Sequence, residues 1–362
     1  MTTVRSILES RARDTCPIPP ATTVCEHATA YTLDAVSPLP SRAAARAAFV
    51  VMTILFALWV LPSRNYPLGA NAEASPEKLA RGTAATPYQY RVLIPWLVTR
   101  GTPAKELSGA EIKARYWWTE FIALVGLGLV FRRYLAFFID SYGLTCIFAL
   151  SLFALLQFNF RLQDYYPYDI PSMLFFTAGL IFIYEGKWWW FYPLFAVATL
   201  NRETSLFLTL ATALVWFDRQ PRLRTVGHVA VQGLLWLTIK WLLFDAYRGN
   251  PSGGYGLFQP QLKMNIMMVL GQPATALIAL STWAYLWIPV AGRYNRIRHR
   301  QLRRTLLIVP CVVVAMLPVG VINEVRIYAE VLPVVLAAAA VIFVDYLQQV
   351  LVQNPDPLRS AE

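Results

Sequence analysis

Arginine and carboxylate side chains recur in short polar stretches between long apolar runs. The densest of these stretches is the pentad Asn201–Ser205, with the sequence Asn-Arg-Glu-Thr-Ser, which lies inside an apolar region from Trp188 to Phe217. An ionisable side chain at bilayer depth costs on the order of 3 kcal/mol on insertion scales unless it faces protein or water. We therefore expect Arg202 and Glu203 to face a polar interior.

These residue types are suited to binding phosphate and to moving a proton. Arginine offers a planar set of donors that matches phosphate, and a nearby carboxylate can accept the proton of an attacking hydroxyl. The candidate catalytic carboxylates are Asp164, Asp169 and Glu203. The candidate substrate- and phosphate-binding residues are Arg91, Arg161, Arg202, Arg326, Glu324, Tyr88, Tyr90 and Asn201.

Each candidate also has a purely structural interpretation. Arg91 could anchor a helix at the membrane surface, and Asp169 could cap the helix that begins at Ile170. Arg202 and Glu203 could pair with each other or across helices. Glu324 and Arg326 could be solvated in a short turn.

Metal and nucleophile chemistry has little support in the pattern. The three histidines are far apart and the four cysteines form no metal-binding motif, so we expect no His/Cys metal site, although carboxylate-bound Mg²⁺ or Mn²⁺ stays open. No histidine is predicted on the face that carries the polar stretches, which argues against a Ser-His-Asp or Cys-His nucleophile. The glycine-rich segment 249–256 does not match a P-loop.

The composition indicates an all-α, polytopic integral membrane bundle. The 362 residues are 57% hydrophobic and 15% charged, against roughly 25% charged in soluble domains. The net charge of +11 reflects basic residues in short loops between spans, the usual orientation signal, so nucleic acid is not an expected partner.

The helices that must position the candidates follow from the apolar runs. We expect a disordered cytoplasmic tail at 1–43, a transmembrane domain at 44–352 and a cytoplasmic tail at 353–362. About ten membrane segments are expected, at roughly 46–62, 116–131, 142–159, 169–184, 188–200, 204–217, 226–244, 266–290, 305–322 and 328–351.

Two features interrupt this series of spans. The segments 188–200 and 204–217 are too short to cross fully, at roughly 20 Å each as helices, so they should form a hairpin around the pentad 201–205. The outer loop 63–115 should carry a surface helix within 86–99, because its apolar part is too short to span.

The arginine clusters at 219–224 and 293–304 should be cytoplasmic, which places both termini inside. The polar stretches then fall on one outer face, where a site built from several loops is the economical interpretation.

The chain resembles the GT-C superfamily of membrane glycosyltransferases. The resemblance rests on the many-span pattern, the long first outer loop with its surface helix and the outer polar motifs. Pro87–Pro95, the pentad and Asn323–Tyr328 also look like stretches of uncharacterised bacterial membrane proteins.

The resemblance implies a polyprenyl-phosphate sugar donor, with an acid of the first outer loop as base. This chain departs from that pattern, because no aspartate lies between Asp34 and Asp140. Three alternatives stay open. A glutamate of the outer loop is the base, or Asp164 or Asp169 is the base, or the protein is not a transferase.

The expected function is thus inverting sugar transfer from a lipid-phosphate donor to an envelope glycan or lipid at the periplasmic face of a bacterial inner membrane. The expected partners are membrane lipids, a lipid-linked sugar and other envelope-glycan assembly proteins. The alternatives are a transporter or flippase for a lipid-linked glycan, a polymerase subunit and a structural subunit. A transporter should carry polar residues on both sides of a central path, whereas the inner half reads as apolar.

Overall fold

The computed structural model describes residues 41–63, 73–160, 166–219, 221–251 and 261–353. The expected tails at 1–43 and 353–362 lie almost wholly outside this part of the chain. The chain divides into two units, residues 1–44 and 45–362, and the second contains every element discussed below apart from the first three residues of α2.

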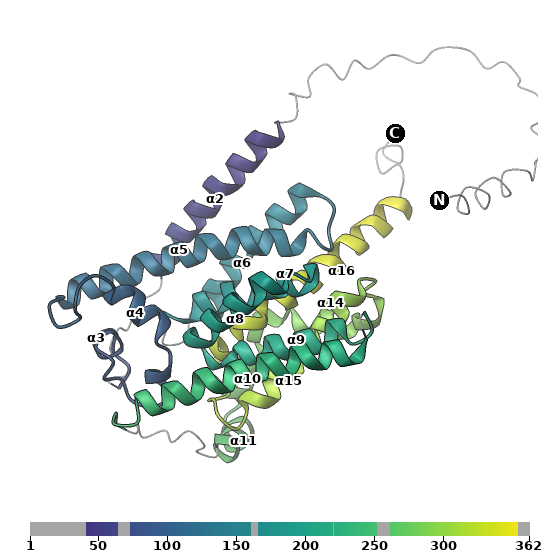
Figure 1. Ribbon diagram of the computed structural model, residues 1–362. Coiled ribbons are helices and arrows are strands. Elements are labelled where there is room, and N and C mark those ends of the chain that lie inside the picture. The colour runs from purple at the N-terminus through teal and green to yellow at the C-terminus, as the bar shows by residue number, and fades with distance from the viewer. Residues whose placement is uncertain (1–40, 64–72, 161–165, 220, 252–260, 354–362) are drawn as a thin grey trace, which may run out of the picture. The chain divides into compact units, whose positions relative to one another are not determined.

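The described residues form helices and no strand, which confirms the all-α prediction. In chain order (Figure 1) the α-helices are α2 Arg42–Ser63, α3 Pro76–Ala80, α4 Leu93–Thr99, α5 Gly109–Leu135, α6 Tyr142–Phe160, α7 Asp169–Glu185, α8 Trp188–Asn201, α9 Leu206–Trp216, α10 Arg222–Ala246, α11 Gln261–Gly271, α12 Pro273–Leu280, α13 Trp287–Gly292, α14 Arg300–Thr305, α15 Ile308–Met316 and α16 Leu332–Gln353. The 3₁₀ turns are η1 Tyr88–Tyr90, η2 Glu203–Ser205, η3 Thr282–Tyr285, η4 Tyr294–Arg296 and η5 Val325–Val331.

Four of the described helical segments are long and apolar enough to cross a membrane. They are Arg42–Leu61, Tyr142–Phe160, Arg222–Ala246 and Val325–Val350. The pair α11 and α12 adds a fifth if its 108° bend lies within one broken span. Several apolar helices could thus cross a membrane, while a count of about ten membrane segments stays a prediction.

The two short arms around the pentad are present as helices. Helix α8 has 14 residues and α9 has 11, so neither reaches the roughly 20 residues that a crossing needs. Arg202 separates them with extended backbone dihedrals, φ −157° and ψ 146°. The helix expected within 86–99 is also present, as η1 and α4, although α4 has only seven residues.

Two expected continuous spans are broken. Helix α11 ends before Pro273, whose ring removes a backbone donor and starts α12. Further on, Trp283, Ala284 and Tyr285 have φ values of 55°, 51° and 61°, a left-handed conformation unfavourable for residues with a Cβ. The span expected at 305–322 is broken between the end of α14 at Thr305 and the start of α15 at Ile308. The break includes Leu306, whose carbonyl lies four residues before Pro310 and therefore has no α-helical N–H donor.

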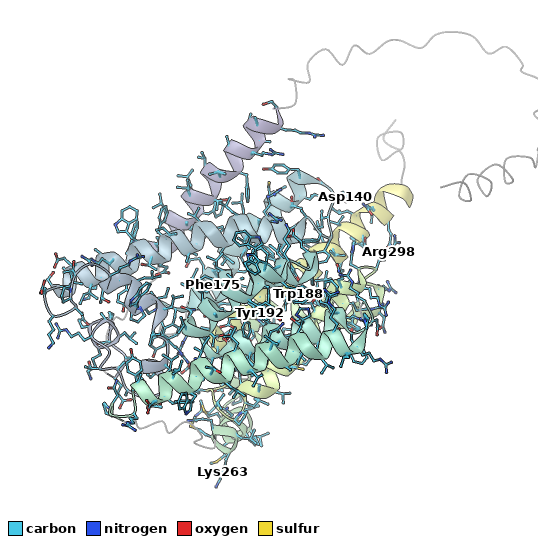
Figure 2. All side chains as sticks on the ribbon, viewed as in Figure 1. Asp140, Phe175, Trp188, Tyr192, Lys263 and Arg298 are labelled. Atoms are coloured by element: carbon cyan, nitrogen blue, oxygen red, sulfur yellow. The ribbon has the colours of Figure 1, made fainter. Side chains whose placement is uncertain are left out.

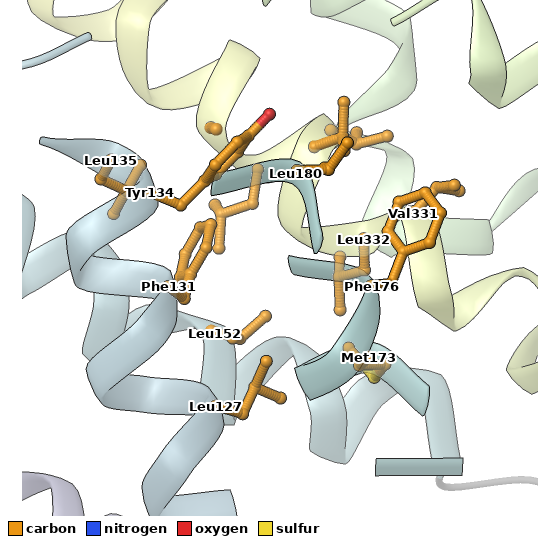
Figure 3. Packing of buried hydrophobic residues seen from close by; sticks show 14 of the residues in the cluster. Leu127, Phe131, Tyr134, Leu135, Leu152, Met173, Phe176, Leu180, Val331 and Leu332 are labelled. Carbon is orange, nitrogen blue, oxygen red and sulfur yellow. The ribbon is translucent and has the colours of Figure 1, made fainter. Parts of the chain in front are cut away.

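The apolar core positions the hairpin. Helix α7 packs against α5, α8 and α9, and α9 packs against α10. Figure 3 shows α5 side chains such as Phe131 facing Leu152 of α6, Phe176 of α7 and Leu332 of α16. Close approach is required at Gly179 on α7, where an added Cβ would lie 2.8 Å from a Leu208 methyl group of α9.

Candidate functional site

Five segments that are far apart in sequence meet around the pentad. They are the loop after η1, the start of α7, the pentad itself, α10 and the turn η5. Four of these segments are joined by ion pairs between charged side chains (Arg91–Glu203, Arg202–Asp169, Arg202–Glu330 and Arg326–Asp169). We call these six residues, together with Glu324 and Lys240, the pentad cluster.

Arg91 and Glu203 form a bidentate ion pair within the cluster. Arg91 Nη2 lies 2.6 Å from Glu203 Oε1 and Nε donates to Oε2 at 3.3 Å, while Nη1 donates to the Tyr168 hydroxyl at 2.5 Å. The Arg91 side chain is 9% exposed and that of Glu203 is 38% exposed. Arg91 is therefore a buried partner of the pentad and not a surface anchor.

Asp169 is the buried centre of a second set of contacts. Arg202 Nη1 lies 3.1 Å from its Oδ1 and Arg326 Nη1 lies 3.6 Å from its Oδ2. Oδ2 also accepts from the Tyr166 backbone N–H at 3.2 Å. The N-cap of α7 is Tyr168, so capping by Asp169 is wrong. At 1% exposure, Asp169 is positioned to hold two arginines in place.

Two further carboxylates complete the arginine contacts. Glu330 on η5 accepts from the Thr204 hydroxyl and lies 3.4 Å from Arg202 Nη1. Glu324 lies 2.7 Å from Arg326 Nη2 and is 35% exposed. Since the Arg326 side chain is 6% exposed, the solvated-turn interpretation is wrong for Arg326. Arg202 and Glu203 pair across helices and not with each other.

Stacked tyrosines line one side of the cluster. The rings of Tyr88 and Tyr166 lie 5.2 Å apart and those of Tyr166 and Tyr168 lie 5.3 Å apart. The Arg91 guanidinium lies 4.4 Å from the Tyr168 ring centre, and Arg326 lies 4.4 Å from that of Tyr166. Such cation–π contacts fix the guanidinium planes.

Three buried basic donors in this part of the described chain have no hydrogen-bond partner. They are Arg202 Nε, Arg326 Nε and Lys240 Nζ. The side chains are almost fully buried, with Lys240 4% exposed. A buried donor without an acceptor is costly, so these atoms are the strongest local indication of an absent acceptor.

The other sequence candidates take different places. Asn201 donates from Nδ2 to the Tyr168 carbonyl and the Ser172 hydroxyl at 3.0 and 2.7 Å, and so ties α8 to α7. Tyr90 is buried against Phe244, with ring centres 4.5 Å apart. Arg161 and Asp164 lie outside the described residues.

Glu330 and Lys240 were not among the sequence candidates. Each is a charged residue inside an apolar run: Lys240 lies within 226–244, and Glu330 lies within 328–351, which also contains Asp345. The signal that could have found them is the cost of a charge in a membrane span, which marks functional or paired residues.

One face of α10 is polar where the sequence reads as apolar. His228, Gln232, Trp236 and Lys240 follow one another at helical spacing. The Tyr192 hydroxyl lies 2.7 Å from His228 Nδ1, and Figure 2 labels Tyr192 with its neighbour Trp188. Gln232 Nε2 donates to Thr212 at 3.2 Å, and Trp236 Nε1 donates to the Glu203 carbonyl at 3.0 Å. The expectation of an apolar inner half is therefore wrong for α10.

A separate charged group, the Asp218 group, joins the two arginine-rich loops. Asp218 pairs with Arg300 at 2.5 Å and also with Arg304. The hydrogen bond from Arg304, followed by the charges of Arg304 and Arg300, lowers the pKa of Asp218. These side chains are much more exposed than those of the pentad cluster, at 39% for Asp218 and 65% for Arg300.

Within the described ranges, no three His, Cys, Asp or Glu side chains gather in a way that could hold a metal ion. The carboxylates of the pentad cluster face arginines instead. The suggestion of Mg²⁺ or Mn²⁺ thus gains no geometric support from this part of the chain.

Comparison with known proteins gives no relative. No protein-family model matches the chain, and neither a curated protein nor a solved structure matches it. The resemblance to GT-C enzymes therefore stays a prediction.

Proposed function

We propose that this protein is a membrane glycosyltransferase that transfers a sugar from a polyprenyl-phosphate donor to an envelope glycan or lipid acceptor. The observation that carries the proposal is the convergence of Arg91, Arg202 and Arg326 from three distant segments, with two guanidinium Nε donors left unpartnered. Arginines fixed by buried carboxylates form a preorganised phosphate site.

The roles within the site follow from burial. Arg202 and Arg326 bind the donor phosphate, held by Asp169 and Glu330. Glu203 is the base, because it is 38% exposed whereas Asp169 is 1% exposed. The tyrosine stack from Tyr88 to Tyr168 supports the sugar face.

The reaction is a single inverting displacement. The acceptor hydroxyl oxygen forms a bond to the anomeric carbon as the bond from that carbon to the phosphate oxygen breaks. Glu203 takes the hydroxyl proton, and the lipid phosphate leaves with the bonding electron pair. The arginines stabilise the charge on the leaving phosphate.

The direct test is release of the free lipid carrier, as polyprenyl phosphate or polyprenyl diphosphate. Purified protein in lipid nanodiscs is incubated with an envelope lipid extract, and both lipid phosphates are measured by mass spectrometry. We expect wild-type protein to release the free carrier, and we expect Arg202→Ala and Glu203→Gln to lose at least a hundredfold of that rate, the scale of general-base and electrostatic contributions. No release by the wild type above a heat-treated control would overturn the proposal.

The proposed site faces the outside of a bacterial inner membrane, with both termini in the cytoplasm. A thiol reagent that cannot cross the membrane should label Glu324→Cys but not Arg300→Cys in intact cells. Labelling only at position 300 would place the pentad cluster on the cytoplasmic side and would exclude a periplasmic lipid-linked donor.

A second candidate is a transporter or flippase for a lipid-linked glycan. The polar face of α10 favours it, because buried polar side chains along a candidate span are typical of transport paths. Gln232→Leu separates the two candidates: it should block translocation by a transporter and leave sugar transfer by an enzyme intact.

A further inference from the structure

Lys240 is the one ammonium group of the pentad cluster, among the described residues, that neither candidate function uses. It lies on α10 one turn beyond Trp236, which binds the Glu203 carbonyl. Its Nζ interacts electrostatically with Glu203 and Arg91, yet it makes no hydrogen bond. Both Glu203 oxygens are already held by Arg91. The ammonium group thus lacks the acceptor that a buried charge requires.

The unpartnered donors fall into two groups, according to the carboxylates that their side chains adjoin. Arg202 Nε and Arg326 Nε belong to the arginines that pair with Asp169 and Glu330. Lys240 Nζ interacts with the Arg91–Glu203 pair. Arg202 and Glu203 are consecutive residues, so the two groups are neighbours. The first group is suited to one phosphoryl group, and Lys240 is suited to another anionic group next to it.

We propose that Lys240 forms a second phosphoryl subsite, so that the group bound at the pentad cluster is a diphosphate on a lipid. This inference rests on the proposed function and adds the class of leaving group: Arg202 and Arg326 bind one phosphoryl group, and Lys240 binds the other. A compact, strongly hydrated ammonium is suited to this role as a point charge. The apolar, candidate membrane-spanning α10 on which Lys240 lies makes a lipid the source of the diphosphate.

The test compares two short-chain prenyl phosphates with an inorganic probe. Dissociation constants for farnesyl diphosphate, farnesyl monophosphate and inorganic pyrophosphate are measured on the full chain in detergent. We expect wild-type protein to bind the diphosphate about tenfold more tightly than the monophosphate, and to bind pyrophosphate more weakly than farnesyl diphosphate. In Lys240→Met this preference should fall to within about twofold, and Lys240→Arg should restore most of it.

A matched control and a folding readout keep the result interpretable. Lys263→Met removes an exposed lysine of α11 and should leave the preference unchanged. Because Lys240 Nζ has no partner, Lys240→Met should not lower the melting temperature without ligand. A merely structural lysine would show the opposite pattern, a lower melting temperature with an unchanged preference.

The outcomes separate this inference from the proposed function. If the wild type binds the monophosphate but shows no preference for the diphosphate, or if Lys240→Met keeps the preference, the second subsite is wrong and the proposed function stands. If neither lipid binds, both fail. If pyrophosphate binds as tightly as farnesyl diphosphate, the subsite stands but the lipid source is overturned.

Discussion

The pentad cluster and the Asp218 group use the same chemistry in opposite surroundings. Both pair arginines with carboxylates, but Asp169 and Arg202 are 1% and 5% exposed, whereas Asp218 and Arg300 are 39% and 65% exposed. Water screens the exposed pairs, so they contribute little. Removing one member of a buried pair leaves an uncompensated charge. The comparison indicates that the pentad cluster is a buried network of charges and that the Asp218 group is an exposed contact between loops.

The largest effect is expected at Asp169, which binds two arginines. Asp169→Ala should lower the free energy of unfolding by about 3–5 kcal/mol, because Arg202 and Arg326 would both lose a buried partner. Thermal or denaturant unfolding in detergent measures it. A loss below about 1 kcal/mol would place Asp169 in the same class as exposed pairs.

A smaller loss is expected for Arg91→Ala. Its partner Glu203 is 38% exposed, so water compensates part of the lost pairing, and we expect roughly 2 kcal/mol. The double variant Arg91→Ala/Glu203→Ala should be more stable than the sum of the single losses predicts. Additive losses would show that the two side chains do not interact.

The Thr204 hydroxyl should matter less than the ion pairs. Thr204→Val keeps the side-chain shape but removes the donor to Glu330, with an expected loss of about 1.5 kcal/mol. Thr209→Val is the matched control, since the Thr209 hydroxyl has no hydrogen-bond partner among the described residues. Equal losses in both variants would mean that the Glu330 contact is not stabilising.

The smallest effect is expected at Asp218, and it should depend on pH. The pKa of Asp218 is lowered in the folded state, so its pairing stabilises the protein above the unfolded-state pKa and is lost as the pH falls through the folded pKa. Asp218→Asn should therefore melt slightly below wild type at pH 7 and match it in acid. A difference that grows in acid would contradict this sign.

The helices were predictable because apolar runs of near-constant hydrophobicity define their length. Helices α6, α7 and α8 begin and end within a few residues of the expected spans. The left-handed residues at 283–285 were not predictable, since none is glycine. Trp283 is held in this conformation by residues that are distant in sequence. Its backbone N–H donates to Asn159 Oδ1 at 3.2 Å, and its ring Nε1 donates to the Tyr328 carbonyl at 2.9 Å.

Most of the charged residues of the pentad cluster were predictable from the sequence, but the arginine–carboxylate pairs that they form were not. The cost of a charge at bilayer depth marked Arg202 and Glu203, and the predicted topology, which placed the polar stretches on one outer face, added Arg91, Asp169 and Arg326. Which carboxylate each arginine contacts depends on how α7, α10 and η5 pack, and sequence spacing carries no such information. Glu330 and Lys240 were missed because each lies within a long apolar run and outside the short polar stretches.

The most direct test of the account is binding of farnesyl monophosphate to wild-type protein, Arg326→Gln and Arg300→Gln. Arg326 belongs to the pentad cluster and Arg300 to the Asp218 group. We predict that the wild type binds, that Arg326→Gln weakens binding at least tenfold, a change of about 1.4 kcal/mol, and that Arg300→Gln has no effect. Equal binding by Arg326→Gln and wild type, or no binding by wild type, would contradict the assignment of the pentad cluster as a phosphate site.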